Sequence, residues 1–278
     1  MPELPEVETI KNDVLPFVKN KIISNVVVRN AKLRWPVTRG LSKILVSQKI
    51  KDVMRRGKYL IFYCDKGSLL IHLGMSGTLT IVEKNTPAKK HDHVDICFAN
   101  GFCLRFSDPR KFGCVLWVKG DPLKYKLLRN LGVEPLSCEF NSNYLFSKTC
   151  KSNRAIKLLL MDSKVVVGVG NIYANEALFR AGVHPETLVK NLSKRQCSII
   201  VRAVKKVLAD AIKAGGTSFK DYRKADGTPG YFQQKLLVYG RQGQPCKKCK
   251  TILQSMRLGQ RMTVFCPVCQ KTFGKKLS

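Results

Sequence analysis

Four cysteines near the C-terminal end of the chain have the spacing of metal ligands. They form two Cys-x-x-Cys pairs, Cys246 with Cys249 and Cys266 with Cys269, and the 16 residues 250–265 separate the pairs. Each pair can form a knuckle whose thiolates reach one tetrahedral ion, as in a four-cysteine structural zinc site. Two disulfides or free thiols are the alternative, but an intracellular chain favours zinc. Because protein fills all four positions, we expect one Zn²⁺ that supports the fold and does no chemistry.

A second group of reactive residues lies at the N-terminus, which reads Met-Pro-Glu-Leu-Pro-Glu. If Met1 is removed, the nitrogen of Pro2 becomes a secondary amine, which titrates near pH ~8 rather than at the ~10 of lysine. An uncharged amine of this kind can attack an electrophilic carbon and form an iminium, which is a covalent electron sink. Glu3 then suits proton transfer beside the amine, and Glu6 suits positioning of the pair. An N-terminal proline without a role is the alternative, and these residues alone favour it.

The charge of the chain limits the classes of partner that we expect it to bind. Its 278 residues include 50 Lys and Arg against 19 Asp and Glu, a net charge of +31, and 44% are hydrophobic, as in a packed globular protein. Such an excess of positive charge repels itself and is typical of proteins that bind a polyanion. Nucleic acid is favoured over an anionic membrane, because the basic residues are spread along the whole chain.

Secretion and membrane insertion are not expected. No stretch approaches the roughly 18 consecutive apolar residues of a membrane helix, and the first residues lack the basic start and apolar run of a signal peptide. The remaining seven cysteines stand singly in apolar or strand-like stretches, which predicts buried free thiols rather than a disulfide scaffold. They are Cys64, Cys97, Cys103, Cys114, Cys138, Cys150 and Cys197.

Short runs rich in Val, Ile, Leu, Phe and Tyr dominate residues 20–118 and predict a β-sandwich or barrel. Turn residues such as Asn100-Gly101 separate the runs. A helix is expected over residues 4–20, although Pro16 weighs against its second half. The expected strands are Ile22–Arg29, Tyr59–Tyr63, Ser68–Leu73, Thr78–Val82, Val94–Phe98, Cys103–Phe106 and Val115–Val118.

After Leu131 the pattern becomes helical. Helical composition covers Arg154–Asp162 and Ile172–Ala181. Leu192–Ala214 is the clearest helix, because Ser193 and Gln196 make a capping box and the apolar residues share one face. A polar loop follows, and strand-like residues between the cysteine pairs indicate a hairpin.

The order of these parts, together with a series of motifs, resembles the formamidopyrimidine-DNA glycosylase family, whose fold the endonuclease VIII branch shares. The resemblance begins at Met1-Pro-Glu-Leu-Pro-Glu-Val-Glu-Thr9 and spans nearly the full length. Further matching motifs are Arg56–Tyr59, His72–Gly77, Lys90–Asp95, Asp108–Gly113, Val167–Ala174, Ala225–Gln234, Val238–Arg241 and Gln260–Thr263. So many ordered matches exclude chance.

The resemblance implies an α+β, multidomain fold. An N-terminal catalytic β-sandwich domain is expected over residues 1–131, a helix-two-turn-helix DNA-binding domain over 132–225, and a four-cysteine zinc finger over 236–270. A lesion-recognition loop is expected over 217–234, where this chain has the long version that closes over an everted 8-oxoguanine in the formamidopyrimidine branch. An ordinary mobile connection is the alternative for this loop, and mobility suits a lid equally well.

The resemblance also implies a bifunctional DNA glycosylase and AP lyase of base excision repair. Such an enzyme removes oxidised purines, 8-oxoguanine and formamidopyrimidines, from duplex DNA and cuts the strand by β,δ-elimination. By resemblance, Pro2 is the Schiff-base nucleophile and Glu3 the general acid/base, while Lys58 acts in the β-elimination and Arg261 in the δ-elimination. One Lys or Arg among 50 is otherwise a solvated charge or a phosphate contact, so only the matching motifs single out these two.

Three residues match the family's void-filling trio. An enzyme that takes a base out of the stack must fill the hole that remains. Met75, Arg110 and Phe112 suit wedging, pairing with the orphaned cytosine and stacking, although an isolated Met or Phe is more often a core residue. Pro109 and Gly113 indicate a loop, in which Phe112 is expected to be exposed.

Further DNA contacts are implied at His91 and Asn171, the second of which follows two glycines that let the backbone approach phosphate closely. Two departures from the family matter, of which Leu158-Leu159 in place of a more usual Pro-Trp is expected to change only the packing. Where a lysine often contacts DNA, this chain has Ser152, and the serine hydroxyl or its neighbours Lys151 and Arg154 are expected to supply that contact.

Damaged double-stranded DNA is therefore the expected partner of a cytoplasmic monomer, associated with the nucleoid if the source is bacterial. An endonuclease VIII-like glycosylase for oxidised pyrimidines is one alternative. A non-catalytic zinc protein that only binds lesions is another, although the intact Pro2, Glu3, Lys58 and Arg261 argue against it. A zinc-ribbon RNA-binding protein explains the charge and the cysteines but not the N-terminal motif.

Overall fold

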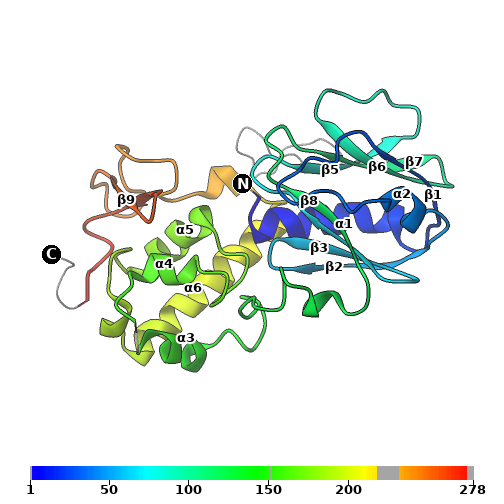
Figure 1. Cartoon of the computed structure of the whole chain (residues 1–278). Helices are drawn as coiled ribbons and strands as arrows, with labels where there is room; N and C mark the ends of the chain where they lie inside the picture. Colours follow the sequence, from blue (N-terminus) through cyan, green and yellow to red (C-terminus); the bar gives the residue numbers. More distant parts are fainter. Residues whose placement is uncertain (1, 151, 218–231, 274–278) are drawn as a thin grey trace. The chain divides into compact units, whose positions relative to one another are not determined.

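The computed structural model of the chain describes residues 2–150, 152–217 and 232–273 (Figure 1). The chain forms two compact units. The first combines Met1–Asn130 with Ala214–Gln233, and the second combines Leu131–Lys213 with Gln234–Ser278. Neither unit is therefore continuous in sequence. The division into three domains stays a prediction beside these two units.

Two antiparallel four-stranded sheets make up most of the first unit (Figure 1). The strand order is β1-β6-β7-β5 in one sheet and β2-β3-β4-β8 in the other. The bounds are β1 (Ile23–Val28), β2 (Ile50–Arg56), β3 (Tyr59–Cys64), β4 (Ser68–His72), β5 (Thr78–Glu83), β6 (Asp92–Phe98), β7 (Phe102–Ser107) and β8 (Cys114–Val118), with the short helices α2 (Leu41–Leu45) and η1 (Pro122–Lys124). The sandwich predicted from the sequence is confirmed.

Helix α1 (Leu4–Val18) packs against β2 and β3 of one sheet and against β5 of the other. Its buried valines and Ile10 belong to the same apolar core as both sheets. Pro16 lies inside the helix, although a proline there weighed against the second half of the helix expected over residues 4–20. The proline removes the donor for the carbonyl of Asn12, but both residues are exposed, so water can replace the lost hydrogen bond.

All seven strands predicted from apolar runs are present, with bounds that differ by one or two residues. Strand β2 was not predicted, because only Ile50 and Val53 of its seven residues are buried and four of the others are charged. A strand that turns one face to solvent gives a weak apolar signal, and its place is determined by pairing with β3.

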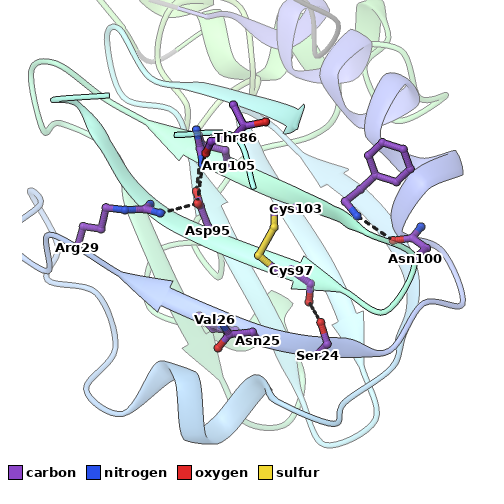
Figure 2. Close-up of a disulfide and its surroundings, with 11 residues drawn as sticks. Ser24, Asn25, Val26, Arg29, Thr86, Asp95, Cys97, Asn100, Cys103 and Arg105 are labelled. Carbon is purple, nitrogen blue, oxygen red and sulfur yellow. Dashed lines mark hydrogen bonds and ion pairs between the residues drawn. A yellow bond between two sulfur atoms is a disulfide. The ribbon is translucent and has the colours of Figure 1, made fainter. Parts of the chain in front are cut away.

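Figure 2 shows Cys97 of β6 and Cys103 of β7 facing each other and joined by a disulfide. The prediction of two free thiols is wrong here, because the antiparallel register places these residues opposite each other. The other single cysteines are free. Three of them are buried as predicted (Cys64, Cys114 and Cys197), whereas two are exposed, contrary to prediction (Cys138 and Cys150).

An ionic cluster is buried in the same sheet (Figure 2). Arg105 donates from Nε and Nη2 to the two carboxylate oxygens of Asp95, each at 2.9 Å, and Nη2 of Arg29 lies 2.7 Å from the same carboxylate. Asp95 is 3% and Arg105 4% exposed. Burial acts to raise the pKa of Asp95, but the hydrogen bonds from Arg105 and Arg29 outweigh it and lower that pKa below its ordinary value.

Helices dominate the second unit. Helices α3 and α5 pack against α6, and α5 also packs against β10. The bounds are α3 (Ser142–Thr149), α4 (Ile156–Leu160), α5 (Asn171–Ala181), α6 (Lys194–Lys213), the 3₁₀ turns η2 (Val189–Asn191) and η3 (Phe232–Lys235), and the hairpin strands β9 (Gln254–Leu258) and β10 (Arg261–Phe265). Helix α3, which is short and largely polar, was not predicted.

The capping box predicted at the start of α6 is confirmed. Gln196 Oε1 accepts from the Ser193 N–H at 2.6 Å, and Ser193 Oγ accepts from the Gln196 N–H at 3.3 Å. At the other end of the helix, Gly215 and Gly216 have φ of 74° and 79°, which ends the helix as predicted. Within the described parts of the chain, no helix is both long and apolar enough to cross a membrane.

We expect Arg105→Met to destabilise the first unit by about 3–5 kcal/mol, because it leaves the carboxylate of Asp95 buried without its main partner. The folded-state pKa of Asp95 is lowered, so this stabilisation is present above the ordinary carboxyl pKa of ~4 and is lost as the pH falls through the folded value. Both tryptophans, Trp35 and Trp117, lie in this unit, so their fluorescence during urea unfolding measures the change.

The matched control is Arg29→Met, which removes the second and more exposed partner of the same carboxylate. The Arg29 side chain is 33% exposed, and we expect a loss of about 1 kcal/mol or less. Equal losses for the two variants, or a loss for Arg105→Met that persists in acid, would contradict the assignment.

Candidate active site

The register of one sheet brings three predicted site segments together. His72, the last residue of β4, pairs with Tyr59, the first residue of β3, and with Cys114, the first residue of β8. The turn that carries Lys58, the loop 73–77 and the loop 108–113 are therefore neighbours at one end of this sheet.

The second sheet presents its loops at the same end. Ser107 ends β7 and pairs with Thr78, which begins β5, and with Asp92, which begins β6. Loop 73–77 joins β4 to β5 and loop 108–113 joins β7 to β8, so both cross from one sheet to the other at this end. His91, directly before β6, belongs to the same end.

An ion pair connects helix α1 to the Lys58 turn. Arg55, near the end of β2, donates from Nε to Glu8 Oε2 at 2.6 Å and from Nη1 to the carbonyl of Gly57 at 3.0 Å. Gly57 has φ of 58°, which a two-residue hairpin turn requires at its first position. Burial acts to raise the pKa of Glu8, but hydrogen bonds from Lys11 and Arg55 outweigh it and lower the pKa. The first turns of α1 are thus held beside Lys58.

The N-terminal residues of α1 are buried. Pro2 precedes the helix, Glu3 is its N-cap, and Glu3 and Glu6 are each 2% exposed. Glu6 Oε2 accepts from the Glu3 N–H at 2.8 Å, as in a capping box, and Glu6 Oε1 accepts from the Thr217 N–H at 2.8 Å. One carboxylate thus joins the start of the helix to the segment that returns to the first unit after α6. Gly216 lies against it, since a Cβ there would be 3.2 Å from Glu6 Oε1.

His72 is held as a neutral imidazole beside Lys58. Its Nδ1 accepts from the Gly74 N–H at 3.0 Å, and its ring centre lies 4.6 Å from that of Tyr59. Desolvation of the ring lowers the pKa of His72 to about 4, and the charges of Lys58 and Arg34 act in the same direction, although part of the residue reaches solvent. At neutral pH this histidine therefore adds no positive charge next to the lysine.

Asp108 organises both crossing loops and is itself fully buried. Its Oδ1 accepts from Ser76 Oγ at 2.9 Å and from the Arg110 N–H at 3.2 Å, while its Oδ2 accepts from the Gly113 N–H at 2.8 Å. Its backbone carbonyl contacts His93 Nε2 at 2.8 Å. A single carboxylate therefore holds loop 73–77 against loop 108–113.

The two loops approach so closely that glycine is required at the crossing. Gly74 has φ of 64°, and a Cβ there would lie 2.5 Å from the nitrogen of Gly113. A Cβ on Gly113 would lie 2.5 Å from the carbonyl oxygen of His72. Because backbone atoms cause both clashes, a side chain at either position would push the loops apart.

The void-filling candidates lie on these loops. Phe112 is 42% exposed, as predicted, and the Arg110 guanidinium lies 4.9 Å from the centre of its ring. Met75 and His91 are half-buried. Their contacts with DNA stay predictions, but an aromatic ring exposed beside a cation suits stacking on bases.

In the second unit, a lysine and an asparagine hold the strand that begins with Arg261. Lys157, fully buried, donates from Nζ to Thr263 Oγ1 at 2.6 Å and to the Met262 carbonyl at 3.2 Å. Asn171 Nδ2 donates to the same carbonyl at 3.0 Å. The Asn171 amide, expected to contact phosphate, thus also positions β10, and Arg261 is exposed at the start of that strand.

Ser152, where this chain departs from the family, and its neighbour Arg154 both lie within the described residues. Ser152 Oγ accepts from the Arg154 N–H at 3.2 Å. The Arg154 guanidinium pairs with Asp162 at 2.7 Å and donates to the Leu158 carbonyl at 3.1 Å. Lys151 lies outside the described residues, as does most of the predicted lesion-recognition loop. Ser152 and Arg154 are both engaged in these bonds, and which of the three residues contacts DNA stays a prediction.

The four paired cysteines form one cluster. Their sulfur atoms all lie within 4.8 Å of one another, with Cys246 and Cys269 at 3.9 Å and Cys249 and Cys266 at 3.4 Å. A tetrahedral zinc with bonds of ~2.3 Å needs sulfurs about 3.8 Å apart, so this cluster fits the ion. Backbone N–H groups of Lys248 and Cys269 point at cluster sulfurs at 3.4 Å, which stabilises thiolates.

A buried acid orients the segment that leads into this cluster. Glu176 of α5 is fully buried, and its carboxylate accepts from three consecutive backbone N–H groups at 2.8–3.0 Å. The donors are Leu237, Val238 and Tyr239. Arg241 continues the segment by donating to the carbonyls of Leu237 and Pro245.

Three residues that position the site, Lys157, Asp108 and Arg55, were not predicted from the sequence. Lys157 carried a signal, since a single lysine within the apolar run Ile-Lys-Leu-Leu-Leu indicates a buried, paired side chain. Asp108 carried a weaker signal, because Asp before Pro is typical of a turn. Arg55 is one of several basic residues in its strand, and no pattern distinguishes it.

Comparison with known proteins assigns all three parts of the chain. Residues 1–115 match the formamidopyrimidine-DNA glycosylase N-terminal domain, residues 131–223 match the formamidopyrimidine-DNA glycosylase H2TH domain, and residues 243–272 match a zinc finger found in FPG and IleRS. The formamidopyrimidine-DNA glycosylase of Shewanella halifaxensis is 50% identical over 271 residues, which cover 98% of this chain and 100% of the relative.

Solved structures of Fpg proteins also match nearly the whole chain. A mutant of the Lactococcus lactis FPG, in complex with a Fapy-dG containing DNA, is 34% identical with a TM-score of 0.91, and the match covers 98% of this chain and 100% of that one. The complex between the Lactococcus lactis Fpg and an abasic site containing DNA is also 34% identical, with a TM-score of 0.89 and coverage of 97% and 100%.

We expect the purified chain to hold one zinc ion and Cys249→Ser to lose it together with the hairpin. Structural zinc contributes about 10–16 kcal/mol in isolated fingers, so the second unit should unfold at a much lower temperature without the ion. Zinc release to a chromophoric chelator and calorimetry measure these effects. Cys138→Ser is the control, because Cys138 is free and exposed, and its zinc content and melting temperature should not change. A Cys249→Ser protein that keeps its zinc would refute the assignment.

Proposed function

Since the chain belongs to the formamidopyrimidine-DNA glycosylase family and is a DNA glycosylase and AP lyase of base excision repair acting on oxidised purines, we propose that its chemistry takes place at the N-terminus of α1. The observation that carries this proposal is the buried arrangement of Pro2, Glu3 and Glu6 beside the Lys58 turn. A base excision enzyme needs a nucleophile and a proton-transfer group within reach of one sugar, and this end of the sandwich supplies both.

The helix terminus suits the proposed nucleophile. The N-terminus of a helix carries a partial positive charge, which favours the uncharged form of an amine placed there. Once Met1 is removed, the Pro2 amine is such a group. The iminium formed from it is positively charged, and the carboxylates of Glu3 and Glu6 can offset that charge. The acidic residues of the N-terminal motif therefore serve the chemistry rather than the affinity for DNA.

The proposed reaction proceeds in three steps. The Pro2 nitrogen bonds to C1′ while the bond between C1′ and the damaged base breaks, and the proton that the nitrogen loses goes to the departing base. Glu3 gives a proton to O4′ as the C1′–O4′ bond breaks, which opens the sugar and leaves the iminium. Loss of a proton from C2′ of the iminium then breaks the C3′–O bond. Loss of a proton from C4′ breaks the C5′–O bond and releases the second phosphate. We assign Lys58 to the first elimination and Arg261 to the second, where cations can stabilise departing phosphate.

Damaged duplex DNA is the proposed partner, and the chain is proposed to act as a monomer in the cytoplasm, at the nucleoid. Met75, Arg110 and Phe112 would occupy the gap left by the everted base. His91 and Asn171, together with Ser152 or its neighbours Lys151 and Arg154, would contact the backbone. Support comes from the exposed ring of Phe112, from the cation beside it and from the solved relatives that hold damaged DNA. The family assignment favours oxidised purines over the oxidised pyrimidines of the endonuclease VIII branch.

We expect borohydride to trap the protein on a duplex with one 8-oxoguanine opposite cytosine, through the nitrogen of Pro2. Mass spectrometry of the digested adduct locates the bond, and the same duplex without borohydride should be cut. Glu3→Gln should lower base excision by about 10²-fold or more, because a positioned acid/base contributes that much. An adduct at Lys58, or intact substrate with protein that starts at Pro2, would exclude the proposed nucleophile.

We also expect Arg55→Met to lower kcat for strand cleavage by about 10–100-fold with little change in KM, because the Lys58 turn loses its tie to α1. Glu8→Gln removes the other half of the ion pair and should have a smaller effect in the same direction. Arg39→Met is the control, since Arg39 is an exposed arginine away from this turn. A rise in KM with unchanged kcat would instead make Arg55 a DNA contact.

A further inference from the structure

The second unit has a groove that the proposed reaction does not use. It runs along one side of α6 and past the end of α5, with a volume of about 770 Å³. We refer to it as the α6 groove. It is lined by Arg180, Ile199, Arg202, Ala203, Lys205, Lys206 and Ala209.

The lining of the α6 groove is mostly apolar, and its shape follows from helical spacing. Ile199, Ala203, Lys206 and Ala209 recur at intervals of three or four residues, so they form one stripe along α6 in which Lys206 carries the only charge. Ala203 and Ala209 are small and lie between long side chains, which leaves a hollow. Water in such a hollow gains little from its walls, and an apolar side chain can replace it favourably.

The rim of the groove is basic and partly unpaired. Arg180, Arg202, Lys205 and Lys206 contribute four positive charges against the single carboxylate of Asp210, which pairs with Lys206 at 3.0 Å and lies 3.8 Å from Arg180. Among the described residues, the Nε–H of Arg180 is buried and has no acceptor. Arg202 is exposed and likewise has no acceptor within that part of the chain. The buried Nε–H is too deep for an outside group to reach, but Arg202 and the exposed part of the Arg180 side chain, which is 23% exposed, can pair with an anionic group supplied from outside.

The groove differs from the surface proposed for DNA. Arg180 lies in the last turn of α5, whereas Asn171 begins that helix, and nine residues of helix separate the two by about 13 Å. A phosphate backbone has no apolar group that would fill the stripe of Ile199, Ala203 and Ala209. An acidic peptide with apolar side chains has both kinds of group.

We propose that the α6 groove docks an acidic segment of a partner protein, in which one or two apolar side chains lie among Asp and Glu. The apolar side chains occupy the floor over Ala203 and Ala209, and the carboxylates pair with Arg180, Arg202 and Lys206. Charge complementarity identifies this occupant, because the rim is positive and the floor is apolar. Such a partner can bind while the proposed DNA-contacting residues at the start of α5 remain free.

The test uses the full-length protein and a short fluorescein-labelled peptide that carries Phe and Leu among Asp and Glu. Fluorescence anisotropy should show saturable binding, and Arg202→Glu should weaken it by about tenfold or more. Ala209→Phe keeps every charge but fills the floor, and it should weaken binding by a similar factor. Arg195→Glu is the matched control, since Arg195 is exposed on the same helix, two turns before Arg202 and outside the groove.

Three outcomes would overturn the proposal. The first is equal affinity for a peptide that has Ser in place of Phe and Leu, because this would mean that net charge alone attracts the peptide. We expect that peptide to bind more weakly than the original. Equal weakening by Arg195→Glu and Arg202→Glu would mean the same. If Arg202→Glu lost affinity for an undamaged duplex as well, and the duplex displaced the peptide, the groove would belong to the DNA surface. Base excision should stay unchanged in all three variants.

Discussion

Backbone N–H groups in loops need acceptors, and in this protein buried carboxylates supply them at several of the loops that position the proposed site. Glu6 accepts from the start of α1 and from Thr217, Asp108 from both crossing loops, and Glu176 from the segment that leads to the zinc cluster. Hydrogen bonds to an ionised acceptor are stronger than those between neutral groups. Each of these acids therefore fixes backbone that no helix or sheet would otherwise fix, and the end of the sandwich that we propose as catalytic depends on two of them.

This use of acid also determines the charge that the chain shows to its surroundings. Of 19 acidic residues, at least six are buried, and several others pair with neighbouring bases. The surface is consequently more positive than the composition alone indicates. For an enzyme that acts on duplex DNA, that field supports binding without regard to sequence and makes the affinity depend on salt. The loops that we propose to fill the gap would then act on DNA that general electrostatic attraction has already brought close.

The sequence alone was sufficient to predict those features in which a residue type has one dominant structural role. Strands with continuous apolar runs, the capping box at Ser193 and the paired cysteines were all predicted, because burial, helix capping and metal binding leave local patterns. Strand β2 and the Cys97–Cys103 pair were not, since their places depend on which strands become neighbours. For the same reason Asp108 and Arg55 escaped notice: their role comes from loops that meet only after both sheets have formed. The motifs identified the chemistry, and tertiary contacts identified the residues that align it.

The bond between Glu6 and Thr217 spans most of the chain, and it affects how the protein is made. Chains emerge from the ribosome N-terminus first, and domains generally fold as they appear. Here the sandwich can assemble from the first 130 residues, but its unit includes 214–233, which is synthesised only after the helices of the second unit. Glu6 lacks the Thr217 donor until then. A nascent chain therefore carries the start of α1 in an unfinished setting, and the contact between Glu6 and Thr217 forms only after most of the chain has been made.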